Sequence, residues 1–308
     1  MPEKRQTFGL SLVLATLLMW GSLPLQLKIL IARIDPTTLT WYRFTGAIVC
    51  LLLFGGPSSL RNLKRGWSRR VAILLGLGGL GLTANYLLYL KGLDHLTPST
   101  AQIIMQTVPF MVLAGGIFVF HEPFAGRQWW GVVFLGGGSI LFFNQRFDQI
   151  VWGSEMVLGI TFILLSAIAW TTFLLCQKAL LDSLSSRTIM LFCYSIGCVI
   201  LGPQAEVETI LRLPTLFIVL VGSATLLAVV SYVSFATALR HVPTTTAGLA
   251  IANIPLITLL GMLIFGGQVP HLQAENLNAL AMFGALLVVV GSTFGAVGPK
   301  KPATHTAE

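Results

Sequence analysis

Charged residues are scarce in this chain of 308 residues. Asp, Glu, Lys and Arg together make up 10% of it, whereas a soluble protein of this length usually carries about 25%. The hydrophobic fraction is 55% and the mean hydropathy is +0.83. There is too little polar surface to enclose a water-soluble core of this size, which excludes a soluble globular protein and indicates an integral membrane protein.

The chain also lacks the residue patterns of a metal site, a nucleotide site and a catalytic centre. Its four cysteines, Cys50, Cys176, Cys193 and Cys198, form no Cys-x-x-Cys pair and stand at no metal-ligand spacing from histidine. No Gly-x-Gly-x-x-Gly motif stands between a strand and a helix. None of the expected membrane spans contains the Asp or Glu that an embedded enzyme would need. We therefore expect no metal, no cofactor and no enzyme activity.

What the chain has in abundance is apolar sequence, in ten segments separated by short polar breaks. Most of the segments are close to the ~20 residues with which a helix crosses a ~30 Å hydrocarbon core. A helix satisfies its own backbone hydrogen bonds in lipid, so we expect an all-α polytopic membrane protein with ten transmembrane helices. The expected helices are 8–27, 38–54, 71–90, 99–120, 129–143, 157–176, 188–201, 215–238, 244–265 and 277–297.

The positive residues indicate how the chain is oriented in the membrane. With the N-terminus inside, thirteen Lys and Arg residues fall on the inner side and five on the outer side, and Arg43 falls within a span. Such a bias places the positive side in the cytoplasm. The net charge of +8 then reflects topology and requires no nucleic-acid partner. We expect a multi-pass protein of the cell inner (plasma) membrane with both termini cytoplasmic.

The chain contains an internal repeat. Segments 92–120 and 238–266 align without a gap, and each has a histidine, then Thr-Ala, then a proline in an apolar run (Pro109 and Pro255). Each proline removes a backbone donor and is expected to kink its helix. Five spans in each half, an odd number, force the halves into opposite orientations, which is the inverted repeat of many secondary transporters. The predicted domains are a first five-helix repeat (1–150), a second, inverted repeat (151–298) and a disordered cytoplasmic tail (299–308).

Glycines on the fifth expected helix indicate close helix packing. Gly136, Gly137 and Gly138 lie in a row there, and Gly131 and Gly138 match Gly284 and Gly291 in the second half. Small residues let neighbouring helices approach closely in a membrane. We expect this helix to pack tightly against another.

Several motifs resemble those of one family of carriers. They are Leu-Met-Trp-Gly-Ser at 18–22, Trp-Tyr-Arg-Phe at 41–44, the run 101–109, Phe-His-Glu-Pro-Phe at 120–124 and Gly-Gly-Gly at 136–138. On these residues the chain resembles the drug/metabolite transporter superfamily, in its ten-helix EamA-type exporter branch. The second half carries weaker versions, with Gln268 where a Glu is usual and no Arg that matches Arg43. The resemblance implies outward transport of a small metabolite, an amino acid or a related amphipathic compound.

Polar and aromatic side chains within the expected helices form the candidate substrate site. Polar side chains inside lipid must face protein or water. Gln102 and Gln106 stand i,i+4 on one helix, and Trp20 and Trp170 occupy matching mid-span positions. Arg43 either extends to the outer headgroups or faces the cavity and binds a carboxylate. The candidate substrate-binding residues are Trp20, Arg43, Asn85, Tyr86, Gln102, Gln106, Trp170, Tyr232 and Asn253. Interhelical hydrogen bonding is the alternative role for the polar ones.

The expected partners are the lipid bilayer and a small-molecule metabolite, and the protein is either a monomer or a homodimer. Other functions stay open at this point. A carrier of phosphorylated or nucleotide sugars would favour several fixed cations, and only Arg43 lies within the spans. A channel shares inverted-repeat symmetry with carriers, and a membrane-embedded enzyme is the alternative from another class.

Overall fold

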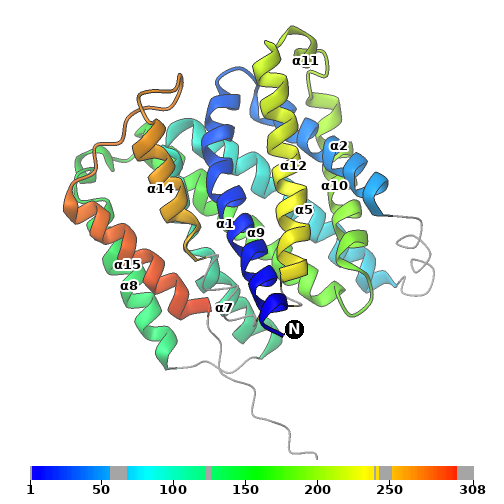
Figure 1. Ribbon diagram of the computed structural model, residues 1–308, viewed down its shortest axis with the longest axis horizontal. Helices are drawn as coiled ribbons and strands as arrows, with labels where there is room; N and C mark the ends of the chain where they lie inside the picture. The colour runs from blue at the N-terminus through cyan, green and yellow to red at the C-terminus, as the bar shows by residue number, and fades with distance from the viewer. Residues whose placement is uncertain (1, 56–67, 122–125, 239–240, 243–251, 297–308) are drawn as a thin grey trace, which may run out of the picture.

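The computed structural model describes residues 2–55, 68–121, 126–238, 241–242 and 252–296. Within these ranges the chain folds into helices, with no strand (Figure 1). The expected tail, 299–308, lies outside the described residues, as does the beginning of the expected helix 244–265.

The helices follow the expected apolar segments, except that the segment 99–120 forms two helices and the helix expected over 71–90 extends to His95. The first part of the chain forms α1 (Pro2–Ile31), α2 (Pro36–Gly55), α5 (Arg69–His95), α6 (Pro98–Met105), α7 (Val108–Phe120) and α8 (Arg127–Phe142). The second part forms α9 (Glu155–Leu180), α10 (Ser186–Leu201), α11 (Thr209–Arg212), α12 (Thr215–Ala238), α14 (Ile254–Phe265) and α15 (Ala279–Ala296). Two short 3-10 helices, Phe147–Gln149 and Gly202–Gln204, lie in the connections.

Six of the described helical stretches are long and apolar enough to cross a membrane. They are Thr7–Ile31, Arg69–His95, Pro98–Val119, Glu155–Leu180, Ser186–Gln204 and Thr215–Phe235. Three shorter apolar helices are Gln128–Phe142, Ile254–Phe265 and Ala279–Phe294. The expectation of an all-helical membrane protein is confirmed, while the number of ten spans stays a prediction.

The helix expected over 99–120 is divided in two. α6 ends at Met105 and α7 begins at Val108, with Gln106 and Thr107 in a turn between them. Pro109 stands in the first turn of α7, where its missing N–H costs nothing, whereas in an unbroken helix it would clash with the preceding turn. Pro255 takes the same place in the first turn of α14. The two prolines therefore stand at matching positions, each in the first turn of its helix.

The helices of both halves share one apolar core at the end of the molecule where α1 and α5 finish. Leu30, Leu39, Leu93, Ile163 and Ala224 belong to it, and each is fully buried. These residues come from α1, α2, α5, α9 and α12, so the core joins the two halves. α1 and α12 lie beside one another in the middle of the molecule (Figure 1).

α8 and α15 form a closely packed antiparallel pair at one side of the molecule (Figure 1). A Cβ added to Gly138 would lie 2.7 Å from the carbonyl oxygen of Gly284, and one added to Gly291 would lie 2.8 Å from that of Gly131. Gly137, in contrast, has open space where a Cβ would be. The expected close approach is therefore present, and within the Gly-Gly-Gly run Gly138 supplies it.

Candidate functional site

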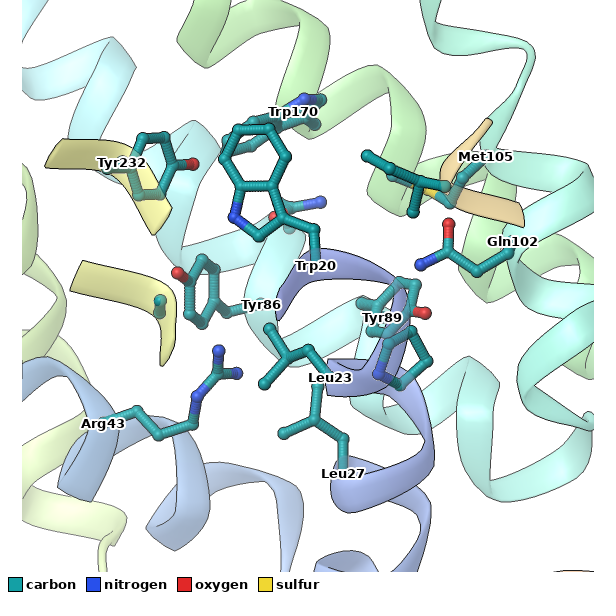
Figure 2. A pocket seen from close by; sticks show the side chains of 14 residues that line it. Trp20, Leu23, Leu27, Arg43, Tyr86, Tyr89, Gln102, Met105, Trp170 and Tyr232 are labelled. Atoms are coloured by element: carbon teal, nitrogen blue, oxygen red, sulfur yellow. The ribbon is translucent and has the colours of Figure 1, made fainter. Parts of the chain in front are cut away.

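A cavity of about 260 Å³ lies between helices of both halves. Residues of α1, α2, α5 and α6 line it from the first half, and residues of α9, α12 and α14 from the second (Figure 2). Ligand pockets usually measure about 300–1,000 Å³. A cavity just below that range suits a single small metabolite.

Seven of the nine candidate residues line this cavity: Trp20, Arg43, Asn85, Tyr86, Gln102, Trp170 and Tyr232. They come from six different helices, so the fold brings together side chains as far apart in the chain as Trp20 and Tyr232. Their contact with a substrate stays a prediction.

Helical periodicity accounts for most of the lining residues that sequence reasoning missed. Leu23, Pro24 and Leu27 follow Trp20 at i+3, i+4 and i+7 on α1, so they share its face. Tyr89 stands one turn after Tyr86 on α5 in the same way. Met105 follows Gln102 at i+3 on α6, and Ala228 precedes Tyr232 by four residues on α12. Of the described lining residues, Ile254 has no candidate one turn away on its helix.

Two candidates, Gln106 and Asn253, are not part of the lining. Gln106 is buried, and its side-chain Nε2 donates to the carbonyl oxygen of Ala252 at 3.0 Å. Position 252 is the counterpart of position 106 in the repeat. The hydrogen bond therefore joins the turn before α7 to the turn before α14, at matching positions of the two halves. Asn253 is the residue directly before α14.

Arg43 faces the cavity, with only 5% of its surface exposed. Its Cζ lies 4.6 Å from the centre of the Tyr86 ring, and Figure 2 shows the guanidinium directed toward that tyrosine. Its Nε is buried and has no hydrogen-bond partner among the described residues. Of the two arrangements expected for Arg43, the structure has the cavity-facing one.

Aromatic side chains form much of the rest of the cavity wall. The rings of Trp20 on α1 and Tyr232 on α12 meet edge to face at a centroid distance of 5.4 Å. Trp20 also packs against Phe235 at 5.7 Å, and Trp170 packs against Phe173 at 5.1 Å. Contacts of this kind hold flat rings in fixed orientations. The wall is thus apolar and aromatic, with few polar atoms.

Asn85 holds α5 to α9 as well as lining the cavity. Its Nδ2 donates to the Oγ and the carbonyl oxygen of Ser166, at 2.8 and 3.2 Å, and the Ser166 hydroxyl donates back to the carbonyl oxygen of Asn85 at 3.1 Å. All three bonds are buried. The amide protons of Asn85 are used within the protein, so hydrogen bonds to a ligand would come from other lining residues, among them Arg43, Tyr89 and Gln102.

No group of three His, Cys, Asp or Glu side chains that could hold a metal is found in the described ranges. Cys176 and Cys193 are buried, Cys50 and Cys198 half-buried, and all four are free thiols.

The comparisons with known proteins agree on one kind of protein. The EamA-like transporter family matches the chain twice, over residues 7–144 and 157–294. A protein of Haemophilus influenzae named "Uncharacterized transporter" is 31% identical over 97% of each chain. The "Uncharacterized inner membrane transporter YhbE" of Escherichia coli is 28% identical over 96% of this chain and 93% of YhbE. A crystal structure at 16% identity matches 95% of this chain and 96% of the other with a TM-score of 0.60, which shows likeness of fold alone.

Proposed function

Because the chain belongs to the EamA-like transporter family, we propose that it is a secondary transporter that moves a small metabolite, an amino acid or a related amphipathic compound, outward across the inner membrane. The observation that carries this proposal is the cavity shared by the two halves. Two matched halves of opposite orientation can exchange conformations, so that a site between them opens to each side in turn.

The cavity favours this substrate class over phosphorylated or nucleotide sugars. Phosphate groups bind most tightly where several cations surround them. Among the lining residues that the structure describes, Arg43 is the single cation, and most of the others are apolar or aromatic. A small amphipathic compound suits such a wall better than a sugar phosphate does.

The two segments that match the family, 7–144 and 157–294, support two repeats, which we propose to run over 1–150 and 151–298. The inner-membrane name of YhbE supports the same location for this chain. The lipid bilayer and the metabolite are the proposed partners, with the protein a monomer or a homodimer.

The proposed topology predicts the result of reporter fusions. A reporter that is active only in the cytoplasm should be active after Asp182, in the turn between α9 and α10, and at the C-terminal Glu308. It should be silent after Leu96, between α5 and α6. The excess of Lys and Arg on the inner side is the physical reason. An active fusion after Leu96 would overturn the assigned orientation.

Truncation of a cavity aromatic should reduce transport without loss of folded protein. We expect Trp20→Ala to lower the release of the transported metabolite by roughly tenfold, because a buried aromatic contact with a ligand is commonly worth more than 1 kcal/mol. The measurement compares metabolites in the medium of cells that express the native protein, the variant or no protein. A metabolite that accumulates only with the native protein identifies the substrate and tests the function.

Trp152→Ala is the matched control, because Trp152 is 95% exposed in the connection between α8 and α9. It should release the metabolite at the native rate. The amount of folded variant in the membrane is measured by size-exclusion chromatography of a fluorescent fusion. If Trp20→Ala loses folded protein in step with transport, Trp20 serves packing between α1 and α12 instead of substrate binding.

A further inference from the structure

Among the described residues, the cavity contains a buried positive charge without a negative partner. Arg43 is the one charged side chain of the described lining, which includes neither Asp nor Glu. Its buried Nε makes no hydrogen bond in the part of the chain that the structure describes. A buried charge is costly unless it is paired and hydrogen-bonded, so folded proteins seldom leave one alone. Because no described residue neutralises Arg43, a bound ligand can supply the missing negative partner.

The ring of Tyr86 compensates this charge only in part. Its centre lies 4.6 Å from the Arg43 Cζ, close enough for a cation–π contact. Such a contact gives the guanidinium no hydrogen-bond acceptor, and among the described residues its Nε–H stays unsatisfied. The N–H groups of a guanidinium form a planar fork that binds a carboxylate through two parallel hydrogen bonds.

The other polar groups of the cavity can serve the same anion. The hydroxyl oxygen of Tyr89 is buried and has no hydrogen-bond partner among the described residues. The amide of Gln102 points into the cavity in Figure 2. Both groups can donate a proton to a carboxylate oxygen. The described lining residues include no carboxylate that could pair with an ammonium group.

Because the described lining offers a cation and hydrogen-bond donors but no carboxylate, we propose that the cavity binds a monoanion. This is a compound with one carboxylate at Arg43 and an apolar or aromatic body against Trp20 and Trp170. The inference rests on the proposed function, since it names the ligand class of the same cavity. Within the class of amino acids and related amphipathic compounds, it selects the acid without an amino group. An α-ammonium group lies next to the carboxylate and would be brought close to the Arg43 guanidinium, where the two positive charges repel one another.

Three probes with the same phenyl group and different charges test this. They are 3-phenylpropionate, which is a monoanion, phenylalanine, which is a zwitterion, and phenethylamine, which is a cation. Binding to the purified protein in nanodiscs is measured by the shift in Tm, because a ligand that binds only the folded state stabilises it. We expect 3-phenylpropionate to have a Kd roughly tenfold or more below that of phenylalanine, and phenethylamine to bind weakest.

Arg43→Gln should remove this preference. We expect its Kd for 3-phenylpropionate to rise by about tenfold or more, with the three probes brought to similar affinities. Arg43→Lys keeps the charge without the planar fork and should retain part of the preference. Without ligand, Arg43→Gln should have a Tm at least equal to that of the native protein, since it removes an unpaired buried charge. Arg212→Gln is the control, because that side chain is 83% exposed on α11, and it should bind like the native protein.

The outcomes separate this inference from the proposed function. Tighter or equal binding of phenylalanine, an unchanged preference in Arg43→Gln, or no binding of any probe overturns the monoanion inference. The transport function is judged separately by the release of metabolites from cells, which does not depend on these probes. A transported zwitterion or cation would then leave the function intact and refute the inference.

Discussion

A single methyl group on Gly284 should strongly destabilise this protein, and the side chain of a valine there should prevent most of it from folding. A Cβ at position 284 would lie 2.4 Å from the backbone nitrogen of Phe142 and 2.6 Å from the carbonyl oxygen of Gly138. These are backbone atoms of α8, which cannot turn aside as a flexible side chain does. α8 and α15 would have to separate and lose the close packing that holds helices together in lipid.

The size of the effect follows from the cost of overpacking. Extra atoms in a closely packed interior cost about 1–3 kcal/mol, and more where the backbone has to move. We expect Gly284→Ala to lower the Tm of the purified protein by several degrees and Gly284→Val to yield little folded protein. Gly138→Ala, on the facing helix, should resemble Gly284→Ala, because its Cβ would lie 2.7 Å from the Gly284 carbonyl oxygen and the Val288 nitrogen.

Gly137→Ala is the matched control for these variants. It makes the same substitution in the same helix, one residue away from Gly138, at a position with nothing within 4 Å of the added Cβ. Alanine favours a helix over glycine by about 1 kcal/mol, so the Tm should stay the same or rise slightly. Equal Tm values for Gly137→Ala and Gly284→Ala would contradict the close approach of α8 and α15.

The sequence was sufficient to predict seven of the fourteen described lining residues of the cavity, for a physical reason. A polar or aromatic side chain at mid-depth in a membrane must face protein or water, so a few such residues in apolar helices indicate the inner faces. Trp20, Arg43 and Tyr86 could therefore be identified one by one. An apolar residue such as Ile254, with no candidate one turn away on its helix, could not be identified, because a residue of that kind is equally suited to the lipid face.

Gln106 shows where this reasoning fails. The rule that residues four apart share a helix face holds only while the helix is continuous. Gln102 lies in α6, whereas Gln106 follows its end, where the chain turns toward α7. The turn directs Gln106 to the carbonyl oxygen of Ala252 and away from the cavity lining. Pro109 predicted a kink in this helix. Because a kink changes the direction of the side chains next to it, Gln106 does not share the face of Gln102.

The ends of the helices were also hard to predict from the sequence. Hydropathy predicts the apolar part of the third expected helix, 71–90, but α5 runs to His95. Lys91, Asp94 and His95 are polar and resemble a loop, yet the helix continues through them. Its last carbonyl groups are satisfied by Lys28, whose Nζ donates to the carbonyl oxygens of Leu93 and Asp94 at 2.6 and 2.9 Å. Hydropathy locates the lipid core, whereas the end of a helix depends on partners from elsewhere in the chain.

Glu275 is the residue whose environment differs most from the one that the sequence indicates. It stands in the polar connection between α14 and α15, yet its side chain is only 1% exposed. Arg146 Nη2 lies 3.7 Å from its Oε1, and the hydroxyl of Thr97 donates to the same oxygen. Arg146 also donates from Nη1 to the Thr100 hydroxyl at 2.8 Å. Because Thr97, Thr100 and Arg146 belong to the first half and Glu275 to the second, this buried ion pair links the two halves.

We expect Arg146→Met to lower the stability of the protein by about 3–5 kcal/mol, because it leaves the Glu275 carboxylate buried without its cation. Glu275→Gln should cost less. The amide keeps an oxygen for the Thr97 hydroxyl, and Arg146, whose side chain is 18% exposed, can turn toward water. The measurement is the Tm of each purified variant in the same detergent.

The exposed pair Arg212 and Glu208 supplies the control, since both side chains are 83% exposed and such pairs contribute about 0–1 kcal/mol. Arg212→Met should therefore scarcely change the Tm.

The double variant Arg146→Met with Glu275→Gln separates charge from packing. If the lost stability of Arg146→Met arises from an uncompensated carboxylate, neutralising that carboxylate should restore much of it, so the double variant should melt above Arg146→Met alone. If the loss arises from the packing of the arginine stem, whose guanidinium Cζ lies 5.7 Å from the Phe142 ring centre, the two losses should simply add. Additive losses, or a Tm for Arg146→Met equal to that of Arg212→Met, would show that the ion pair does not hold the halves together. If the double variant instead melts above Arg146→Met, the charge of Glu275 is what makes Arg146 necessary for stability.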